Sequence, residues 1–200
     1  MSFKKTAVYF LMGIFTVGFF ACSGLQVTRV DDNEEIDLSG DWNDTDSKQV
    51  AQEMIADSFA SRWVEDYKMA NGRKPKVIVG SVLNKTEEHI STETFIKDLE
   101  KSFINSGKVT FVASKSQRNE IREEREDQSI NSKNAKKKGN ESAADFMLKG
   151  QINSIFDANK KAQLKYYQVE LELIDLETNE TVWIGQKKIK KVVSKKKYKA

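Results

Sequence analysis

LKYYQVELELIDL, at residues 164–176, is the stretch that decides the fold of this 200-residue chain. Apolar and polar residues alternate along it, which is the period of a β-strand with one face in a core. The face predicted to be buried carries Tyr167, Val169, Leu171 and Leu173. Residues 181–189 alternate in the same way, and the four residues between the two runs include Asn179, which tolerates a positive φ. The two runs therefore predict a β-hairpin.

Upstream of this hairpin, helix and strand patterns follow one another. A β-branched run without alternation at 77–83 predicts a central strand covered on both faces. The other predicted elements are a helix from Ser47 to Asn71-Gly72, a helix from Ser91 or Thr92 to Gly107, a brief strand at 109–112, a charged surface helix behind the Ser114–Gln117 capping box, a loop at 128–140 and a strand at 146–155. These elements predict an α/β (α+β) fold with a mixed sheet of four to five strands flanked by helices.

The N-terminus has the pattern of an export signal. Lys4 and Lys5 precede an uncharged run that ends at Ala21, and this run is too short to span a membrane. Cys22, the only cysteine, directly follows the predicted cleavage point, where a lipoprotein signal places the thiol that is lipidated. The alternative is an ordinary cleaved signal that leaves a free thiol.

Four segments are therefore expected along the chain. Residues 1–21 form the lipoprotein signal peptide, and 22–46 form the lipidated cysteine with a short, acidic, flexible tether. Residues 47–191 form one globular domain, and 192–200 form a basic C-terminal tail. The tail is interpreted as a solvated terminus, and the alternative is a contact with anionic lipid or wall polymers.

The balance of charge argues against nucleic acid as a partner. The chain has 33 Lys and Arg against 30 Asp and Glu, and removal of residues 1–21 takes away two lysines and no acid. The mature net charge is thus close to zero, whereas nucleic-acid binding normally needs a strongly basic face.

The residues also argue against an enzyme, a cofactor or a metal. His89 is the only histidine, so a cluster of imidazole ligands is impossible, and no Cys/His spacing of a zinc site occurs. The glycines match neither a dinucleotide fingerprint nor a phosphate loop. Glu170 and Glu172 share one face of a strand, but a polar, open face does not raise a carboxyl pKa as acid catalysis requires.

The face of the C-terminal strands that points away from the core is the predicted partner-binding surface. If Val182 and Ile184 belong to the core, Trp183 points outward with the polar residues of the neighbouring strands. The candidate contact residues are Tyr166, Gln168, Trp183, Lys187, Lys149 and Gln151. Large aromatic side chains in a polar field are typical of interface hot spots. The alternative is that a helix covers Trp183, which then belongs to the core.

Several separate segments resemble one known family. They are residues 37–46 (DLSGDWNDTD), 90–98 (ISTETFIKD), 104–109 (INSGKV), 122–128 (REEREDQ), 144–148 (ADFML) and 182–188 (VWIGQKK). Together they are similar to the LpoB family, the outer-membrane lipoprotein activators of bifunctional penicillin-binding proteins. The resemblance implies a fold similar to the TolB N-terminal domain and a location on the periplasmic side of the outer membrane, lipid-anchored.

The same resemblance implies a class A penicillin-binding protein as partner and no catalytic residue in this chain. The tether departs from the long, proline-rich linker of the best-known members, because it is much shorter. Two other classes remain open: a structural or export-assembly lipoprotein of the CsgG type, and an envelope glycan-binding module. The strands are too few for the membrane-spanning hairpins of the CsgG type, and a glycan module would need a concave site lined with aromatics.

Overall fold

A computed structural model describes residues 27–31, 34–160 and 162–194. The chain divides into a short unit up to Glu34 and a unit that begins at Glu35, and the helices and strands of the described residues lie in the second unit. The predicted signal peptide, Cys22 and the last six residues of the basic tail fall outside the described residues. No helix of the described part is long and apolar enough to cross a membrane.

The described residues form four helices and five strands. In chain order they are α1 (Asp44–Ala60), α2 (Trp63–Asn71), β1 (Lys76–Asn84), α3 (Thr92–Ser106), β2 (Thr110–Phe111), α4 (Lys115–Asn131), β3 (Phe146–Ala158), β4 (Ala162–Asp175) and β5 (Thr181–Ser194). The sheet has the order β2-β1-β3-β4-β5. Strand β1 runs parallel to β2 and β3, and β3, β4 and β5 are antiparallel neighbours. The predicted mixed sheet flanked by helices is confirmed.

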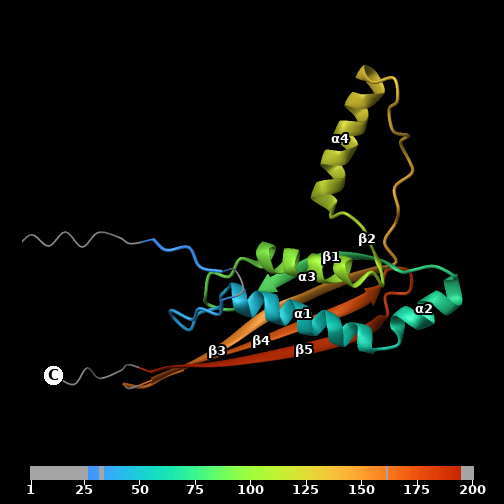
Figure 1. Cartoon of the computed structure of the whole chain (residues 1–200). Helices are drawn as coiled ribbons and strands as arrows, with labels where there is room; N and C mark the ends of the chain where they lie inside the picture. Colours follow the sequence, from blue (N-terminus) through green and yellow to red (C-terminus); the bar gives the residue numbers. More distant parts are fainter. Residues whose placement is uncertain (1–26, 32–33, 161, 195–200) are drawn as a thin grey trace, which may run out of the picture. The chain divides into compact units, whose positions relative to one another are not determined.

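The core lies between the sheet and the helices α1 and α3, which lie side by side on one of its faces (Figure 1). Tyr167, Val169, Leu171 and Leu173 of β4, which were predicted to point inward, are buried there. Phe146, Leu148 and Ile152 of β3 are buried beside them. Helix α3 contributes Phe95, Leu99 and Phe103, and helix α1 contributes Val50, Ala51, Met54 and Ile55. In β1, Val77, Ile78 and Val79 are all buried, so this part of the strand is covered on both faces as predicted.

The first helix differs from the prediction at both ends. It begins at Asp44 rather than after Ser47, because Asn43 and Asp46 form a reciprocal capping box. It also stops at Ala60, and α2 starts separately at Trp63. The carbonyl of Ser58 accepts hydrogen bonds from the Ser61 amide and from Nε1 of Trp63, which gives the chain a local alternative to the helical ladder.

The residues just before α1 pack against the domain, although they were expected to belong to the flexible tether. Trp42 meets the rings of Phe95 and Tyr167 edge-on, with centroid separations of 5.9 and 5.7 Å. The amide of Trp42 also donates to Glu88 at 3.2 Å. The ordered body therefore begins before residue 47, and the part of the tether free of such contacts is shorter than expected.

Helix α4 stands away from the sheet in Figure 1. None of its residues is buried, which confirms the prediction of a surface helix. Its N-terminus has the predicted Ser114–Gln117 capping box. The helix continues to Asn131, beyond the predicted charged run, and residues 132–145 lead back to the sheet.

Candidate functional site

The face of β3, β4 and β5 opposite α1 and α3 carries the first candidate site. Gln151, Glu170 and Gln186 lie in one row across the three strands. Tyr166 and Gln168 precede Glu170 on the same face of β4, since residues two apart along a strand share a face. This surface, here called the open face, is the one on which a partner-binding site was predicted.

The polar side chains of the open face form one hydrogen-bonded network. The hydroxyl of Tyr166 donates to Oε1 of Gln168 at 3.0 Å, and Nε2 of Gln168 donates to Oε1 of Glu170 at 2.6 Å. Gln151 and Gln186 donate to the same carboxylate at 2.9 and 3.1 Å. Hydrogen bonds from Gln151, Gln168 and Gln186 hold the pKa of Glu170 below its ordinary value. The carboxylate is thus charged and fixed in orientation at the centre of the face.

Apolar side chains are exposed around this network. Ile184 on β5 is 67% exposed and lies opposite Glu172 of β4. Leu83 of β1 lies opposite Gln151 and is exposed as well. Lys149 is exposed near the start of β3. The open face thus mixes polar and apolar surface, and a non-obligate interface as a whole is only about as apolar as the rest of a protein surface.

Trp183 does not lie on the open face, so its predicted orientation is wrong. It is only 8% exposed, and its Nε1 donates to Oδ2 of Asp57 in α1 at 3.1 Å. The cause is a bulge: β5 carries one extra residue, Val182, opposite the step from Leu173 to Ile174 in β4. Because the side-chain period of a strand is two, the extra residue moves each later side chain of β5 to the opposite face of the sheet from the one predicted. The alternative in which a helix covers Trp183 is therefore correct.

Lys187 shares the face of Trp183 and was likewise predicted on the wrong side. Its ammonium pairs with Glu53 of α1. A sequence feature that could have revealed the true orientation is Gly185, which lies between the two on the same face. A Cβ at Gly185 would overlap the Trp183 indole ring. A glycine two residues after a tryptophan in a strand is thus explained by a ring that lies flat across it.

A second charged cluster, which was not predicted, lies where β4 begins and β5 ends. Lys165 and Lys191 are cross-strand neighbours there. Lys191 donates to Asp37 at 2.7 Å and to Asp46 at 2.6 Å, while Lys165 pairs with Asp41 and, at 2.9 Å, with Glu88. Tyr167 donates its hydroxyl to the carboxylate of Glu88 at 2.7 Å. Acidic residues of the segment before α1 therefore neutralise two adjacent lysines of the sheet.

The pKa shifts in this cluster follow from burial and from the neighbouring charges. Burial and the adjacent Lys191 lower the pKa of Lys165. Burial alone would lower the pKa of Lys191 too, but hydrogen bonds to Asp37 and Asp46 raise it above its ordinary value. Burial and the bond to Glu88 raise the pKa of Tyr167. These contacts join the segment before α1 to the sheet through opposite charges.

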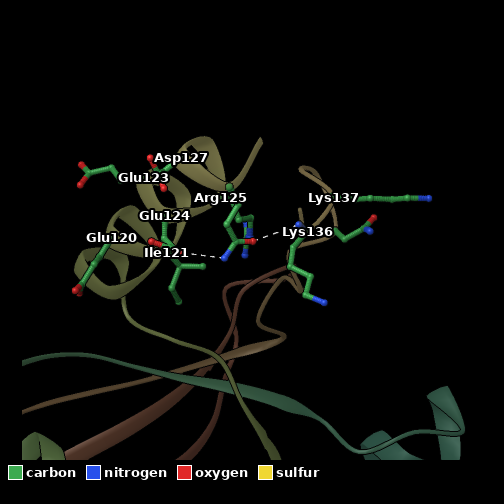
Figure 2. Close-up of a pocket in the computed structure, with 10 residues that line it drawn as sticks. Glu120, Ile121, Glu123, Glu124, Arg125, Asp127, Lys136 and Lys137 are labelled. Atoms are coloured by element: carbon green, nitrogen blue, oxygen red, sulfur yellow. Dashed lines mark hydrogen bonds between the residues drawn. The ribbon is translucent and has the colours of Figure 1, made fainter. Parts of the chain in front are cut away.

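A hollow of about 1000 Å³ lies between α4 and the segment that follows it. Figure 2 shows Arg125 inside it, between α4 and the segment that carries Lys136 and Lys137. Glu141, in the segment that follows α4, holds this segment to the helix by pairing with Arg122 and Arg125, each at 2.7 Å. These hydrogen bonds lower the pKa of Glu141 to about 2. Among the described residues there is no group of three or more His, Cys, Asp or Glu side chains that could hold a metal.

The domain is a mixed sheet with helices on one face and a fixed polar network on the other. The family model for the peptidoglycan-synthase activator LpoB matches residues 46–189. The chain therefore belongs to the peptidoglycan-synthase activator LpoB family, and the resemblance seen in the sequence is confirmed.

Solved structures include members of the same family. The LpoB C-terminal domain from Escherichia coli matches with 16% identity and a TM-score of 0.44, over 72% of this chain and 98% of that domain. The NMR structure of Escherichia coli LpoB matches with 16% identity and a TM-score of 0.42, over 86% of this chain and 82% of that one. The lipoprotein GNA1162 from Neisseria meningitidis matches with 10% identity and a TM-score of 0.38, over 59% of this chain and 83% of that lipoprotein. No curated protein sequence matches the chain.

Proposed function

We propose that this protein is a lipid-anchored regulator on the periplasmic side of the outer membrane that binds a class A penicillin-binding protein and activates it. Membership of the activator family supports this role. The observation that carries the choice of binding surface is the network of Tyr166, Gln168 and Glu170 with Gln151 and Gln186 on the open face.

Such a network suits a binding surface because its side chains are ordered before a partner arrives. Association normally costs about 0.5–1.5 kcal/mol for each flexible side chain that is immobilised. Gln168 and Glu170 already hold each other at 2.6 Å, so much of this cost does not arise on binding. Tyr166 offers an aromatic ring beside them, and aromatic residues are frequent hot spots.

Activation then follows from differential affinity. An activator that binds the productive conformation of a synthase more tightly than the resting one shifts the population toward the productive state. A tenfold shift needs about 1.4 kcal/mol of differential binding. Such a shift needs no catalytic group in the activator, and the proposed role of the open face requires only binding.

The anchor places this surface relative to a membrane. In the proposal, Cys22 carries the lipid, and Lys191 holds Asp37 to the sheet. Fifteen residues, 22–36, therefore bridge the two points and span at most roughly 50 Å when extended. To be activated, a synthase has to approach the membrane that carries the anchor to within the span of these fifteen residues plus the length of the domain.

The test is stimulation of a class A synthase from the same organism by the purified lipoprotein. Gln168→Ala with Glu170→Ala should weaken the interaction by about 2 kcal/mol or more, since it removes the centre of the network. The matched control is Glu123→Ala with Asp127→Ala on α4, which alters charge away from the open face. If the folded open-face variant binds and stimulates as well as wild type, the open face is not the binding surface. If wild type itself neither captures nor stimulates the synthase, the proposed function is wrong.

A further inference from the structure

The end of the sheet that holds the β3–β4 turn carries exposed apolar residues on both of its faces. Ile155 is 65% exposed and Phe156 is 56% exposed, and as neighbours in a strand they point to opposite sides. Val192 of β5 is 68% exposed and lies opposite Leu164 at the same end. Figure 1 shows β3, β4 and β5 continuing past the start of α1 there. This end of the sheet, here called the tip, is therefore a projecting ribbon with uncovered apolar groups.

Lysines stand beside these apolar groups. Lys160 lies in the β3–β4 turn, and Lys190 lies opposite Tyr166 and shares a face with Val192. Both are exposed, and among the described residues neither has a carboxylate within ion-pair distance. Exposed acids are found at the tip as well: Asp157 in β3, and Asp37 and Asp41, which are paired with Lys191 and Lys165. An apolar group flanked by solvated ammonium groups is the composition of a surface that rests on anionic lipid headgroups.

The segment between Glu35 and α1 is held at the tip too. Asp37 and Asp41 are held by Lys191 and Lys165, which sit on the strands of the tip. The segment of the domain that precedes α1 is thus held at this end. A surface tethered within about 50 Å of a membrane experiences a high effective concentration of lipid, so even a weak intrinsic affinity is enough for contact.

We propose that the tip, formed by Ile155, Phe156, Lys160, Lys190 and Val192, docks on the anionic phospholipid surface of the membrane that carries the anchor. This inference rests on the lipid anchor of the proposed function, but it assigns a second and separate attachment. Docking orients the strands away from the bilayer, so that the turn between β4 and β5 points toward the wall. Ile155 and Lys190 lie in one row with Tyr166. Docking therefore covers the Tyr166 end of the open face and leaves the row of Gln151, Glu170 and Gln186 free to meet a partner.

The experiment uses the full lipidated chain reconstituted in vesicles, with a nitroxide on an introduced cysteine. If Cys22 is acylated, wild type takes up no label, which checks the anchor separately. The label is placed at Ile155→Cys and, as a matched control, at Ile184→Cys. Contact with lipid is measured from how often each nitroxide collides with oxygen, which enters the bilayer, and with a nickel complex, which stays in water. Both positions are similarly exposed, at 65% and 67%, and they lie at opposite ends of the sheet. Only the label at residue 155 should become shielded from nickel, in vesicles with about one third phosphatidylglycerol.

Charge reversal tests the lysines. Each lysine near an anionic surface should change the ratio of docked to undocked domain about fivefold, so Lys160→Glu with Lys190→Glu should reduce it at least 25-fold. Lys149→Glu, far from the tip, is the matched control and should leave the ratio unchanged. Melting curves show whether each variant remains folded.

Three results would overturn the docking proposal: equal nickel access at residues 155 and 184, equal docking on vesicles of phosphatidylcholine alone, or immobilisation of the tip label by purified peptidoglycan and not by vesicles. Stimulation of the synthase in detergent solution does not require docking. If the tip does not dock but the synthase is stimulated, the docking proposal is rejected and the proposed function stands. If the tip docks but the synthase is not stimulated, only the proposed function is rejected.

Discussion

Replacement of Trp183 by alanine is the sharpest test of the side-chain orientation in β5. The indole is 8% exposed, lies over Gly185 and donates to Asp57 of α1. Truncation of a buried tryptophan removes its packing and leaves a cavity, which costs about 3–5 kcal/mol of unfolding free energy. Trp183→Phe keeps most of the apolar contact and loses the hydrogen bond, so it should cost about 1 kcal/mol. Urea unfolding followed by circular dichroism measures both values.

The neighbouring residue supplies the control. Ile184 is 67% exposed on the open face, so Ile184→Ala should change the unfolding free energy by no more than about 0.5 kcal/mol. Trp183→Ala and Ile184→Ala change adjacent residues, but the first alters the face that meets the helices and the second alters the open face. A stable Trp183→Ala protein with a strongly destabilised Ile184→Ala protein would show that the bulge at Val182 is absent and that the strand faces are exchanged.

Two further predictions concern Gly185 and Glu141. Gly185→Ala should destabilise the domain by about 1–3 kcal/mol, because its methyl group would overlap the Trp183 ring, and an unchanged melting temperature would mean that the ring is free to move. The pKa of Glu141 is about 2 in the folded chain against an ordinary value of 4.5, so its clamp on Arg122 and Arg125 is complete above pH 4.5 and is lost as the pH falls toward 2. Hydrogen-exchange protection of α4 should decline in that window and should be low at every pH in Glu141→Gln, and pH-independent protection in the wild type would contradict the clamp.

Much of the fold could be predicted because its determinants are local in the sequence. The alternation of residues 164–176 identified the buried side of β4, where Tyr167 and Leu171 prove to be fully buried. Helix ends were predicted from single residues: Gly72 and Gly107 both adopt the left-handed conformation that ends α2 and α3. The family also followed from short segments, since its model matches residues 46–189. Each of these features depends on residues a few positions apart, which the sequence displays directly.

Other features depend on contacts between distant residues. Glu88 and Tyr167 are 79 positions apart, and nothing in either local sequence indicates their hydrogen bond. The partners of Lys165 and Lys191 come from the segment before α1, which reads as a solvated tether because its acids find their counterions only in the folded sheet.

The orientation of Trp183 shows the same division between sequence and structure. The alternation of residues 181–189 determined that this segment is a strand with two unlike faces. Which face meets the helices was decided by the one-residue bulge at Val182, which arises where β5 pairs with β4. A strand has a period of two, so a single unpaired residue exchanges its faces, and only the register with its neighbour reveals that residue.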